Sequence, residues 1–515
     1  MPELIDKTKS ICPVCLNVID ADIVENDGKV LITKICSNHG NFEDIYWSDY
    51  EIFKKAKRFH IDGPKLQNPH TESREGCPND CGLCSGHLTP TVLCNIDVTN
   101  RCNIKCPICF ANAEATGYVL EPSMEELIVM MKSVREEKPM PCLAVQFAGG
   151  EPTVRDDLPQ IIQKAKELGF IIVLVATNGV RIAKDLDFCK ELIKNGMDIV
   201  YLQFDGINEK PYITARGFNA LPIKLQALNN FRKADFPNIV LVPTLVKGIN
   251  DDQAGDIIYF GAQNIDIVRG INFQPISFSG RVNKEELEKM RITIPDFIKI
   301  VEEQTNGEIL AKDFYPVTSV SSFSNFVEAW RKTPQVKFSC HEHCGVATYV
   351  IIEDNGELTP ITQLINFDDF FGFMDDLTKK LENNGGKITK AKVIAEVAKG
   401  LPRTIERRSE HLDIKKLIWD IFRKGNLQAL TKFSYRSLLV GCMHFQDAYN
   451  FDVERLKRCA IHYAVPGGKV IPFCTYNSLY REKIEKQYAI PLDIWEKNNR
   501  KINTFKKDTI TVINS

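Results

Sequence analysis

The sequence has little net charge, no long hydrophobic run and no apolar amino terminus. Its 65 basic and 67 acidic residues leave a net charge of -2, which gives no indication of a nucleic-acid partner. The longest apolar runs, such as Ile171 to Ala176, are far shorter than the roughly 20 residues that cross a bilayer. Met1 to Ser10 is charged and polar, unlike a secretion signal. We therefore expect a cytoplasmic location, with any lipid contact peripheral.

Cysteine, by contrast, is abundant, with 17 residues in a chain of 515. A chain of this length suggests about three domains. A disulfide framework is typical of short secreted chains, so a reducing and anaerobic cytoplasm is the better expectation here. The spacing of the cysteines then becomes the main source of information about function.

The most specific spacing is Cys-x3-Cys-x2-Cys, formed by Cys102, Cys106 and Cys109 after an apolar strand. Three thiolates can hold three corners of a 4Fe-4S cube and leave the fourth iron without a protein ligand. Zinc knuckles normally use two pairs of ligands, and ferredoxin loops supply a fourth nearby cysteine, so both alternatives are weaker. With Ile108 before the last cysteine, the segment resembles the radical SAM superfamily, in which S-adenosylmethionine (SAM) chelates the open iron.

Apolar runs alternate with helical patterns from Thr91 to about Ser279. The six runs are Leu93–Val98, Leu143–Phe147, Ile171–Ala176, Ile199–Phe204, Ile239–Leu245 and Gly270–Ile276. We predict an α/β fold: a partial (β/α)6 radical SAM barrel, with an N-terminal metal-knuckle module and a C-terminal cluster-binding extension. Because active sites of β/α barrels lie at the carboxyl ends of the strands, residues just after each run are candidate functional residues.

The segment Gly149-Gly150-Glu151-Pro152 follows the second run. Glycines let the backbone approach a ligand closely, and a carboxylate can accept hydrogen bonds from an ammonium group. The segment resembles the motif that holds the SAM amino group in radical SAM proteins. The same resemblance implies cofactor contacts for Phe110, Thr177, Asn178, Asp205, Arg216 and Gln274, although Arg216 could equally be a surface arginine and the strand-end residues turn caps.

The amino terminus contains two tight knuckles, joined by an alternating segment with an Asn26-Asp27-Gly28 turn. Their four candidate ligands are Cys12, Cys15, Cys36 and His39. This pattern predicts one mononuclear metal, either zinc or a single iron as in rubredoxin. The site is either a folding staple without chemistry or, with iron, a one-electron relay.

A second Cys-x3-Cys-x2-Cys triad lies upstream of the first strand run. We predict an auxiliary 4Fe-4S cluster on Cys77, Cys81, Cys84 and Cys94, in which Cys94 closes the cube, with a zinc site as the alternative. Because Cys94 begins the strand that leads to Cys102, this cluster should lie behind the barrel, roughly 20 Å or more from the catalytic one.

The carboxyl-terminal region contains two similar cysteine-strand-turn-strand segments, typical of hairpins. They resemble the cluster-bearing extensions of many radical SAM enzymes, which implies a second auxiliary 4Fe-4S cluster on Cys340, Cys344, Cys459 and Cys474, with Cys442 as the rival fourth ligand. We interpret Cys142 and Cys189 as buried structural thiols. The predicted domains are residues 1–70 for the knuckle module, 71–90 for the first auxiliary segment, 91–313 for the barrel and 314–515 for the C-terminal domain.

Taken together, the motifs CPNDCGLC, CNIKCPICFA, GGEPT, FSCHEHC and RCAIHYAVPGGKVIPFC resemble the archaeal radical SAM group that contains tetraether lipid synthase. The resemblance implies carbon–carbon coupling of the terminal methyl groups of archaeal diether lipids through a 5′-deoxyadenosyl radical. It also implies a low-potential electron donor such as a ferredoxin, and docking on the inner membrane face through aromatic residues such as Phe367 to Met374, which could instead be core.

Two alternatives to lipid coupling remain. The same group is described as methylating a pterin precursor of methanopterin, and a non-enzymatic electron-transfer protein would use the clusters without SAM. A long apolar tunnel would favour the lipid, whereas a compact pocket with paired polar groups would favour the pterin. We place lipid coupling first and pterin methylation second.

Overall fold

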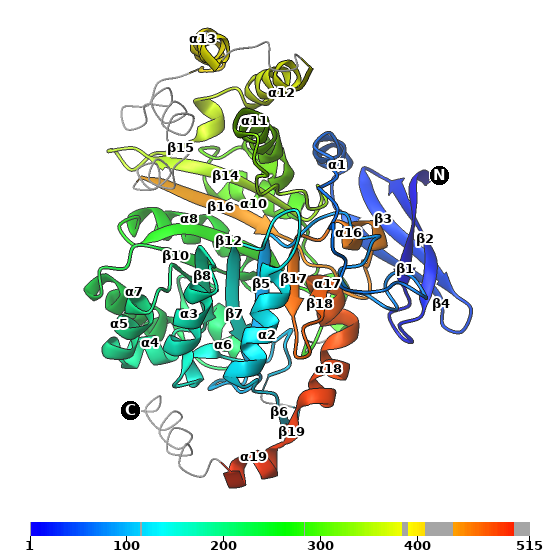
Figure 1. Ribbon diagram of the computed structural model, residues 1–515, viewed down its shortest axis with the longest axis vertical. Helices are drawn as coiled ribbons and strands as arrows, with labels where there is room; N and C mark the ends of the chain where they lie inside the picture. Colours follow the sequence, from blue (N-terminus) through cyan, green and yellow to red (C-terminus); the bar gives the residue numbers. More distant parts are fainter. Residues whose placement is uncertain (1, 114–115, 283, 384–389, 407–435, 499–515) are drawn as a thin grey trace.

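The computed structural model describes every residue except 1, 114–115, 283, 384–389, 407–435 and 499–515. Its main feature is one large sheet whose central strands are parallel, with helices connecting consecutive strands (Figure 1). A small antiparallel sheet made by the amino terminus lies at one side. The predicted α/β class and partial barrel are confirmed.

The N-terminal sheet has the order β1-β2-β3-β4 and is antiparallel throughout. Its strands are β1 (Glu3–Ile11), β2 (Val18–Asn26), β3 (Lys29–Cys36) and β4 (Gly40–Trp47). Asp27 and Gly28 join β2 to β3 with φ angles of 51° and 76°. Positive φ at both central residues is typical of the tight turns that match strand twist, so the Asn-Asp-Gly sequence accounts for this hairpin.

The barrel strands begin and end within a few residues of the predicted runs. They are β5 (Leu93–Thr99), β7 (Ala144–Gly149), β8 (Ile172–Thr177), β9 (Ile199–Gln203), β10 (Ile239–Val242) with β11 (Thr244–Leu245), and β12 (Val268–Pro275). The connecting helices include α2 (Met124–Arg135), α3 (Leu158–Glu167), α5 (Leu186–Lys194), α7 (Leu221–Lys233) and α8 (Ala254–Gln263). Each barrel strand pairs in parallel with its neighbour, so the carboxyl ends of all six meet at one edge.

Strands from the C-terminal region extend the barrel sheet at both ends. β16 (Ser437–Met443) pairs in parallel with β12, and β17 (Ile461–Ala464) pairs in parallel with β5. Two hairpins complete the sheet, because β14 (Gly345–Ile352) pairs with β15 (Leu358–Pro360) and β17 pairs with β18 (Val470–Pro472). Figure 1 shows β16 beside β12 and β17 beside β5. The barrel and the segment after residue 313 therefore share one sheet, and the predicted domain divisions stay a prediction.

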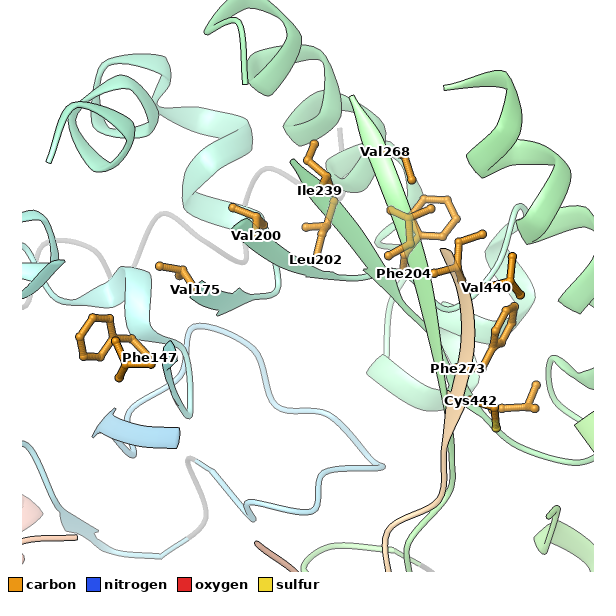
Figure 2. Close-up of a cluster of buried hydrophobic side chains, with 14 of the residues drawn as sticks. Phe147, Val175, Val200, Leu202, Phe204, Ile239, Val268, Phe273, Val440 and Cys442 are labelled. Carbon is orange, nitrogen blue, oxygen red and sulfur yellow. The ribbon is translucent and has the colours of Figure 1, made fainter. Parts of the chain in front are cut away.

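The main hydrophobic core lies between the sheet and its helices. Phe147, Val175, Val200 and Phe273 come from the barrel strands β7, β8, β9 and β12 and are buried to 1% exposure or less (Figure 2). Cys442 of β16 lies in the same core, near Phe273 in the close-up. Its burial raises the pKa of the thiol well above the usual value. This apolar setting is typical of a structural thiol.

The aromatic segment from Phe367 begins helix α12 (Phe367–Asn383). Met374 is buried in a small core with Phe326 of α11 (Ser321–Arg331), and Phe371 is buried in ring contact with Tyr315 and Phe367. This packing is the expected behaviour of a core stripe. Within the described ranges, the structure contains no helix that is both long and apolar enough to cross a bilayer.

Candidate functional site

The barrel pocket is a cavity of about 280 Å³ at the carboxyl ends of the barrel strands. Cys102, Cys106 and Cys109 line it, and no other cysteine of the described chain does. The predicted cofactor residues that line it are Phe110, Gly149, Gly150, Glu151, Thr177, Asn178, Arg216 and Gln274. A cluster held by the three thiolates would present its fourth corner to this cavity rather than to another thiol, so the residues present suit an open cluster.

Two arginines fix the backbone of the cysteine loop, residues 102–109. Arg281 pairs with Cys109 through two backbone hydrogen bonds of 2.9 Å, and its Nε donates to the Cys106 carbonyl at 2.6 Å. Arg216 Nη1 donates to the Ile108 carbonyl at 3.0 Å. These bonds hold a loop without regular secondary structure in one arrangement.

The two glycines of the Gly-Gly-Glu segment allow it to approach the strand that leads to the cysteine loop. Gly149 has a φ of 124°, and a Cβ there would overlap the Thr99 carbonyl oxygen. A Cβ on Gly150 would overlap the Arg101 carbonyl oxygen. The backbone nitrogens of Gly150 and Glu151 donate to these same two carbonyls at 2.8 and 2.9 Å. Any side chain at either glycine would push the two loops apart.

Glu151 connects the second and third strand ends. Its carboxylate accepts from the Thr177 hydroxyl at 2.7 Å, from the Asn178 backbone N–H at 2.7 Å and from the Thr153 hydroxyl at 2.6 Å. The side chain is buried, and burial raises the pKa of its carboxyl although these bonds oppose the shift. The carboxylate therefore orders the pocket wall, in addition to any contact with a ligand.

Asp205 and Arg216 form a buried bidentate ion pair at the end of β9, with both N–O distances at 2.8 Å. Burial alone would raise the pKa of the Asp205 carboxyl, but the Arg216 guanidinium lowers it below its usual value. Arg216 Nη2 also donates to the Thr244 hydroxyl at 2.8 Å. The sequence assigned both residues to SAM, whereas in the structure Arg216 is committed largely to Asp205 and to the cysteine loop.

The N-terminal site has the dimensions of a tetrahedral metal site. The Cys15 and Cys36 sulfurs are 3.9 Å apart, and His39 Nδ1 is 3.6 Å from the Cys12 sulfur and 3.5 Å from the Cys36 sulfur. Tetrahedral zinc bonds of about 2.3 Å to sulfur and about 2.05 Å to nitrogen imply separations of about 3.8 and about 3.6 Å. The four donor atoms all lie within 4.8 Å of one another, so they suit a single ion without rearrangement.

The structure places Cys94 and Cys81 of the upstream triad in two different hydrophobic cores. Cys77 and Cys81 interact with each other, and Cys81 belongs to a small core against which Cys77 and Cys459 pack. Cys94 instead belongs to the main core, where its thiol lies close to Cys142 and donates to its neighbour's carbonyl. Successive side chains of a strand point to opposite faces of the sheet. The next residue, Asn95, lines the barrel pocket, so the Cys94 side chain points to the helices. The assignment of Cys94 to the upstream cluster therefore stays a prediction.

The four predicted C-terminal ligands come together. Burial raises the pKa of the Cys340 thiol, and the nearby Cys344 and Cys459 raise it further. Burial also raises the pKa of the Cys459 thiol, and the nearby Cys474 and Cys344 raise it further. The buried Arg455 guanidinium lies beside Cys344 and Cys474 and would offset the charge of thiolates there. Cys442, the rival ligand, is buried in the main core instead.

Two features in or next to the barrel pocket were not identified from the sequence, and the first lies behind its wall. Lys224 of α7 is only 1% exposed, and its Nζ donates to the Gln203 side-chain oxygen at 2.9 Å and to the Asn178 carbonyl. Burial lowers the pKa of this lysine to about 8. Lys224 falls on the same helical face as the apolar residues Ala227, Leu228 and Phe231, and this spacing could have indicated from the sequence that it is buried. The second feature is a pair of carboxamides, Asn95 and Gln146, on the inner face of β5 and β7.

Two family models match this chain, one over the barrel and one over the N-terminal sheet. The radical SAM superfamily model matches residues 96–260, and the model of an HMPTM N-terminal zinc ribbon domain matches residues 4–48. The chain is 50% identical over 499 residues to 7,8-dihydro-6-hydroxymethylpterin dimethyltransferase of Methanocaldococcus jannaschii. That alignment covers 96% of this chain and 97% of the relative.

More distant similarity is confined to part of the chain. GTP 3′,8-cyclase of Clostridium acetobutylicum is 26% identical over 199 residues, which cover 37% of this chain and 61% of that protein. Among solved structures, methylornithine synthase superposes with a TM-score of 0.33 at 14% identity, covering 42% of this chain and 64% of that one.

The prediction of a tetraether lipid synthase is wrong, because the relative that matches nearly the whole chain is named as a pterin dimethyltransferase. The same finding overturns carbon–carbon coupling, the diether lipid substrate and docking on a membrane face. The cluster motifs used for the prediction are shared within the group and carry no substrate contact, so they could not separate the two activities. The prediction of a radical SAM, iron–sulfur and metal-binding protein is supported.

Proposed function

Since the chain belongs to the radical SAM family of the Methanocaldococcus jannaschii pterin dimethyltransferase, we propose that it transfers methyl groups to a pterin. The 50% identity over nearly the full length of both proteins carries the proposal. The barrel pocket supports it, because the cavity is compact and contains the paired carboxamides Asn95 and Gln146.

The cysteine loop is the proposed catalytic centre. A 4Fe-4S cluster bound by Cys102, Cys106 and Cys109 would supply the electron that cleaves SAM to methionine and a 5′-deoxyadenosyl radical. Arg281 and Arg216 position the loop through the Cys106 and Ile108 carbonyls. The protein's part is to hold SAM and the pterin in one cavity and to limit access of water to it.

The remaining proposed cofactor contacts surround this loop. Glu151 accepts from the SAM ammonium group, with Gly149 and Gly150 giving the close backbone approach. Thr177 and Asn178, at the end of β8, and Gln274, near the end of β12, contact the nucleoside, and Phe110 covers it. Asp205 and Arg216 act mainly as positioning residues, because their charges are satisfied by each other.

Further metal centres lie outside the barrel pocket. We assign a mononuclear metal to the N-terminal site, and the match of residues 4–48 to a zinc ribbon domain supports zinc. The C-terminal cysteine group would hold one auxiliary 4Fe-4S cluster beside Arg455. Cys77, Cys81 and Cys84 are the candidate ligands of a third cluster, without Cys94.

Each methyl transfer replaces one pterin hydrogen by a methyl group. With SAM as both radical source and methyl donor, the net reaction takes two SAM molecules and two electrons from a one-electron reductant. It releases methionine, 5′-deoxyadenosine and S-adenosylhomocysteine, which balances atoms and electrons.

The proposal is tested by incubating anaerobically reconstituted protein with dithionite, SAM and 7,8-dihydro-6-hydroxymethylpterin. Chromatography with mass detection should show a pterin that is heavier by one or two methylene units, and only when the reductant is present. SAM cleavage that leaves the pterin unchanged at all protein concentrations would contradict the proposed substrate.

A further inference from the structure

Lys224 of helix α7 is a buried lysine that makes no direct ion pair with a carboxylate of the described residues. Its side chain is 1% exposed, and its Nζ donates to the Gln203 side-chain oxygen at 2.9 Å and to the Asn178 backbone carbonyl. Both partners are neutral and lie at the ends of the neighbouring strands β8 and β9, in the wall of the barrel pocket. Lysines are almost never fully buried unless their charge is paired, so this one is expected to have a role that outweighs the cost of its burial.

The contact with Asn178 leads to the start of the cysteine loop. Asn178 Oδ1 accepts from the Val180 backbone N–H at 3.0 Å, which leaves its Nδ2 to donate elsewhere. This Nδ2 donates to the Asn103 side-chain oxygen at 2.7 Å and lies 4.0 Å from the Cys102 sulfur. Because Lys224 binds the Asn178 carbonyl, it holds the backbone from which this side chain reaches the first cysteine of the loop.

The contact with Gln203 leads to the other end of the loop. A lysine ammonium group can only donate, so it binds the amide oxygen of Gln203 and leaves the amide nitrogen to donate to Asp205. Asp205 in turn binds Arg216, whose Nη1 donates to the Ile108 carbonyl at 3.0 Å. One ammonium group therefore supports the loop at both ends, beside its first and its last cysteine.

The charge of Lys224 also lies close to the cysteine loop. Burial lowers the pKa of this lysine to about 8, while the negative charges of Asp205, Glu151 and Cys106 oppose the shift. At neutral pH the side chain is therefore still largely protonated. A positive charge behind the loop favours thiolates in the loop, and it favours the more negative, reduced state of a cluster that they bind.

We infer that Lys224 is a positioning residue of the proposed catalytic centre, which holds both ends of the cysteine loop and raises the reduction potential of the cluster bound there. The inference rests on the proposed cluster and does not depend on the identity of the methyl acceptor. Arg216 is less suited to this electrostatic role, because its charge is paired with Asp205 in a bidentate contact. Lys224 acts from behind the pocket wall and so leaves the cavity to SAM and the substrate.

The test is a redox titration of the reconstituted full-length protein, followed by electron paramagnetic resonance. The catalytic cluster is identified as the one whose signal changes when SAM is added, because SAM chelates its open iron. Lys224→Met keeps most of the length of the side chain but removes its charge and its donors, and should shift the midpoint potential of this cluster to a more negative value. The variant should also bind SAM at least about threefold more weakly, because the loop loses two hydrogen bonds that support it.

Lys233→Met is the matched control. It removes the same charge from the exposed end of the same helix, where solvent and salt screen it, and should leave the midpoint potential and the SAM affinity unchanged. Lys224→Arg keeps the positive charge and should keep the midpoint potential of the wild type. If Lys224→Met fails to fold, Lys224→Gln, which keeps a donor but not the charge, carries the same expectation for the potential.

The outcomes distinguish this inference from the proposed function. A wild-type signal that responds to SAM, together with an unchanged midpoint potential in Lys224→Met or Lys224→Gln, would overturn the role of Lys224 and leave the catalytic centre intact. An equal shift in Lys233→Met, or in folded Lys224→Arg, would overturn that role as well, since the local charge would then not be the cause. A reconstituted wild type without a signal that responds to SAM would overturn both the inference and the proposed cluster.

Discussion

The N-terminal site presents four metal donors, whereas the barrel cysteine loop presents three. At the N-terminal site the sulfur and nitrogen atoms already have the separations of a tetrahedral ion. The three barrel thiols instead line a cavity that no fourth cysteine of the described residues enters. Closed sites of this kind are structural, and sites with an open coordination position are reactive. Ligand number and access to a cavity, rather than cysteine content, thus separate the two roles.

The pKa values of Cys12 in the N-terminal site and of Cys102 in the cysteine loop are shifted in opposite directions. Burial would raise the pKa of Cys12, but backbone N–H groups of Cys15 and Val14 lower it to about 6. The pKa of Cys102 is raised well above its usual value by burial and by the charge of Glu151. The Cys12 thiolate is therefore stabilised by the peptide backbone, while the Cys102 thiolate needs the positive charge of a bound cluster.

The largest effect is expected when the open site is removed. Replacing Cys102, Cys106 and Cys109 together by Ala should reduce 5′-deoxyadenosine formation to background and lower the iron content by about four atoms per chain. The N-terminal metal should be retained, as measured by elemental analysis. Undiminished SAM cleavage in this variant would show that the catalytic cluster lies elsewhere.

Cys36→Ser should lower stability and leave SAM binding nearly unchanged. Loss of one ligand from a closed site should release the mononuclear metal and lower the thermal midpoint, because metal binding contributes directly to folding. The affinity for SAM, measured by equilibrium dialysis below the new midpoint, should change by less than about threefold. Loss of SAM binding by the folded variant would mean that the two sites are coupled.

Asp205→Asn tests whether the ion pair supports the cysteine loop. Removing one partner of a buried pair leaves the Arg216 charge uncompensated and should cost about 3–5 kcal/mol in free energy of unfolding. Because Arg216 depresses the pKa of Asp205, the stabilisation should be complete above the unfolded pKa of about 3.9 and be lost as the pH falls through the folded value.

The matched control for this ion pair is Asp266→Asn. It breaks an exposed pair with Arg232, whose side chains are 53% and 44% exposed, and should cost about 0–1 kcal/mol. Urea unfolding of both variants provides the comparison. Equal destabilisation by the two substitutions would contradict the claim that the buried pair contributes more to stability than the exposed one.

Among the cysteine substitutions, the smallest effect is expected at Cys94. Since its thiol lies in the main core with Cys142, Cys94→Ala should leave the iron content unchanged and cost about 1 kcal/mol. Cys459→Ala, in the C-terminal cysteine group, should lose iron. A loss of iron in Cys94→Ala would restore Cys94 as a cluster ligand.

Much of the barrel could be predicted, because its strands are continuous apolar runs and its cysteine loop has a specific spacing. The sequence could not show that β16 and β17 extend the barrel sheet, since such pairing depends on contacts far apart in the chain. Nor could it show that Arg216 is directed to Asp205 or that Asn95 meets Gln146. The substrate was misjudged because cluster motifs report the chemistry of radical formation, whereas substrate choice depends on the pocket wall.

The most direct test of the central claim uses SAM with a deuterated methyl group and 7,8-dihydro-6-hydroxymethylpterin. After reduction of the reconstituted protein, mass spectrometry should find the labelled methyl group in the pterin, with 5′-deoxyadenosine formed in proportion. Formation of 5′-deoxyadenosine while the pterin stays unmethylated would contradict the assignment of the barrel pocket to a pterin methyltransferase.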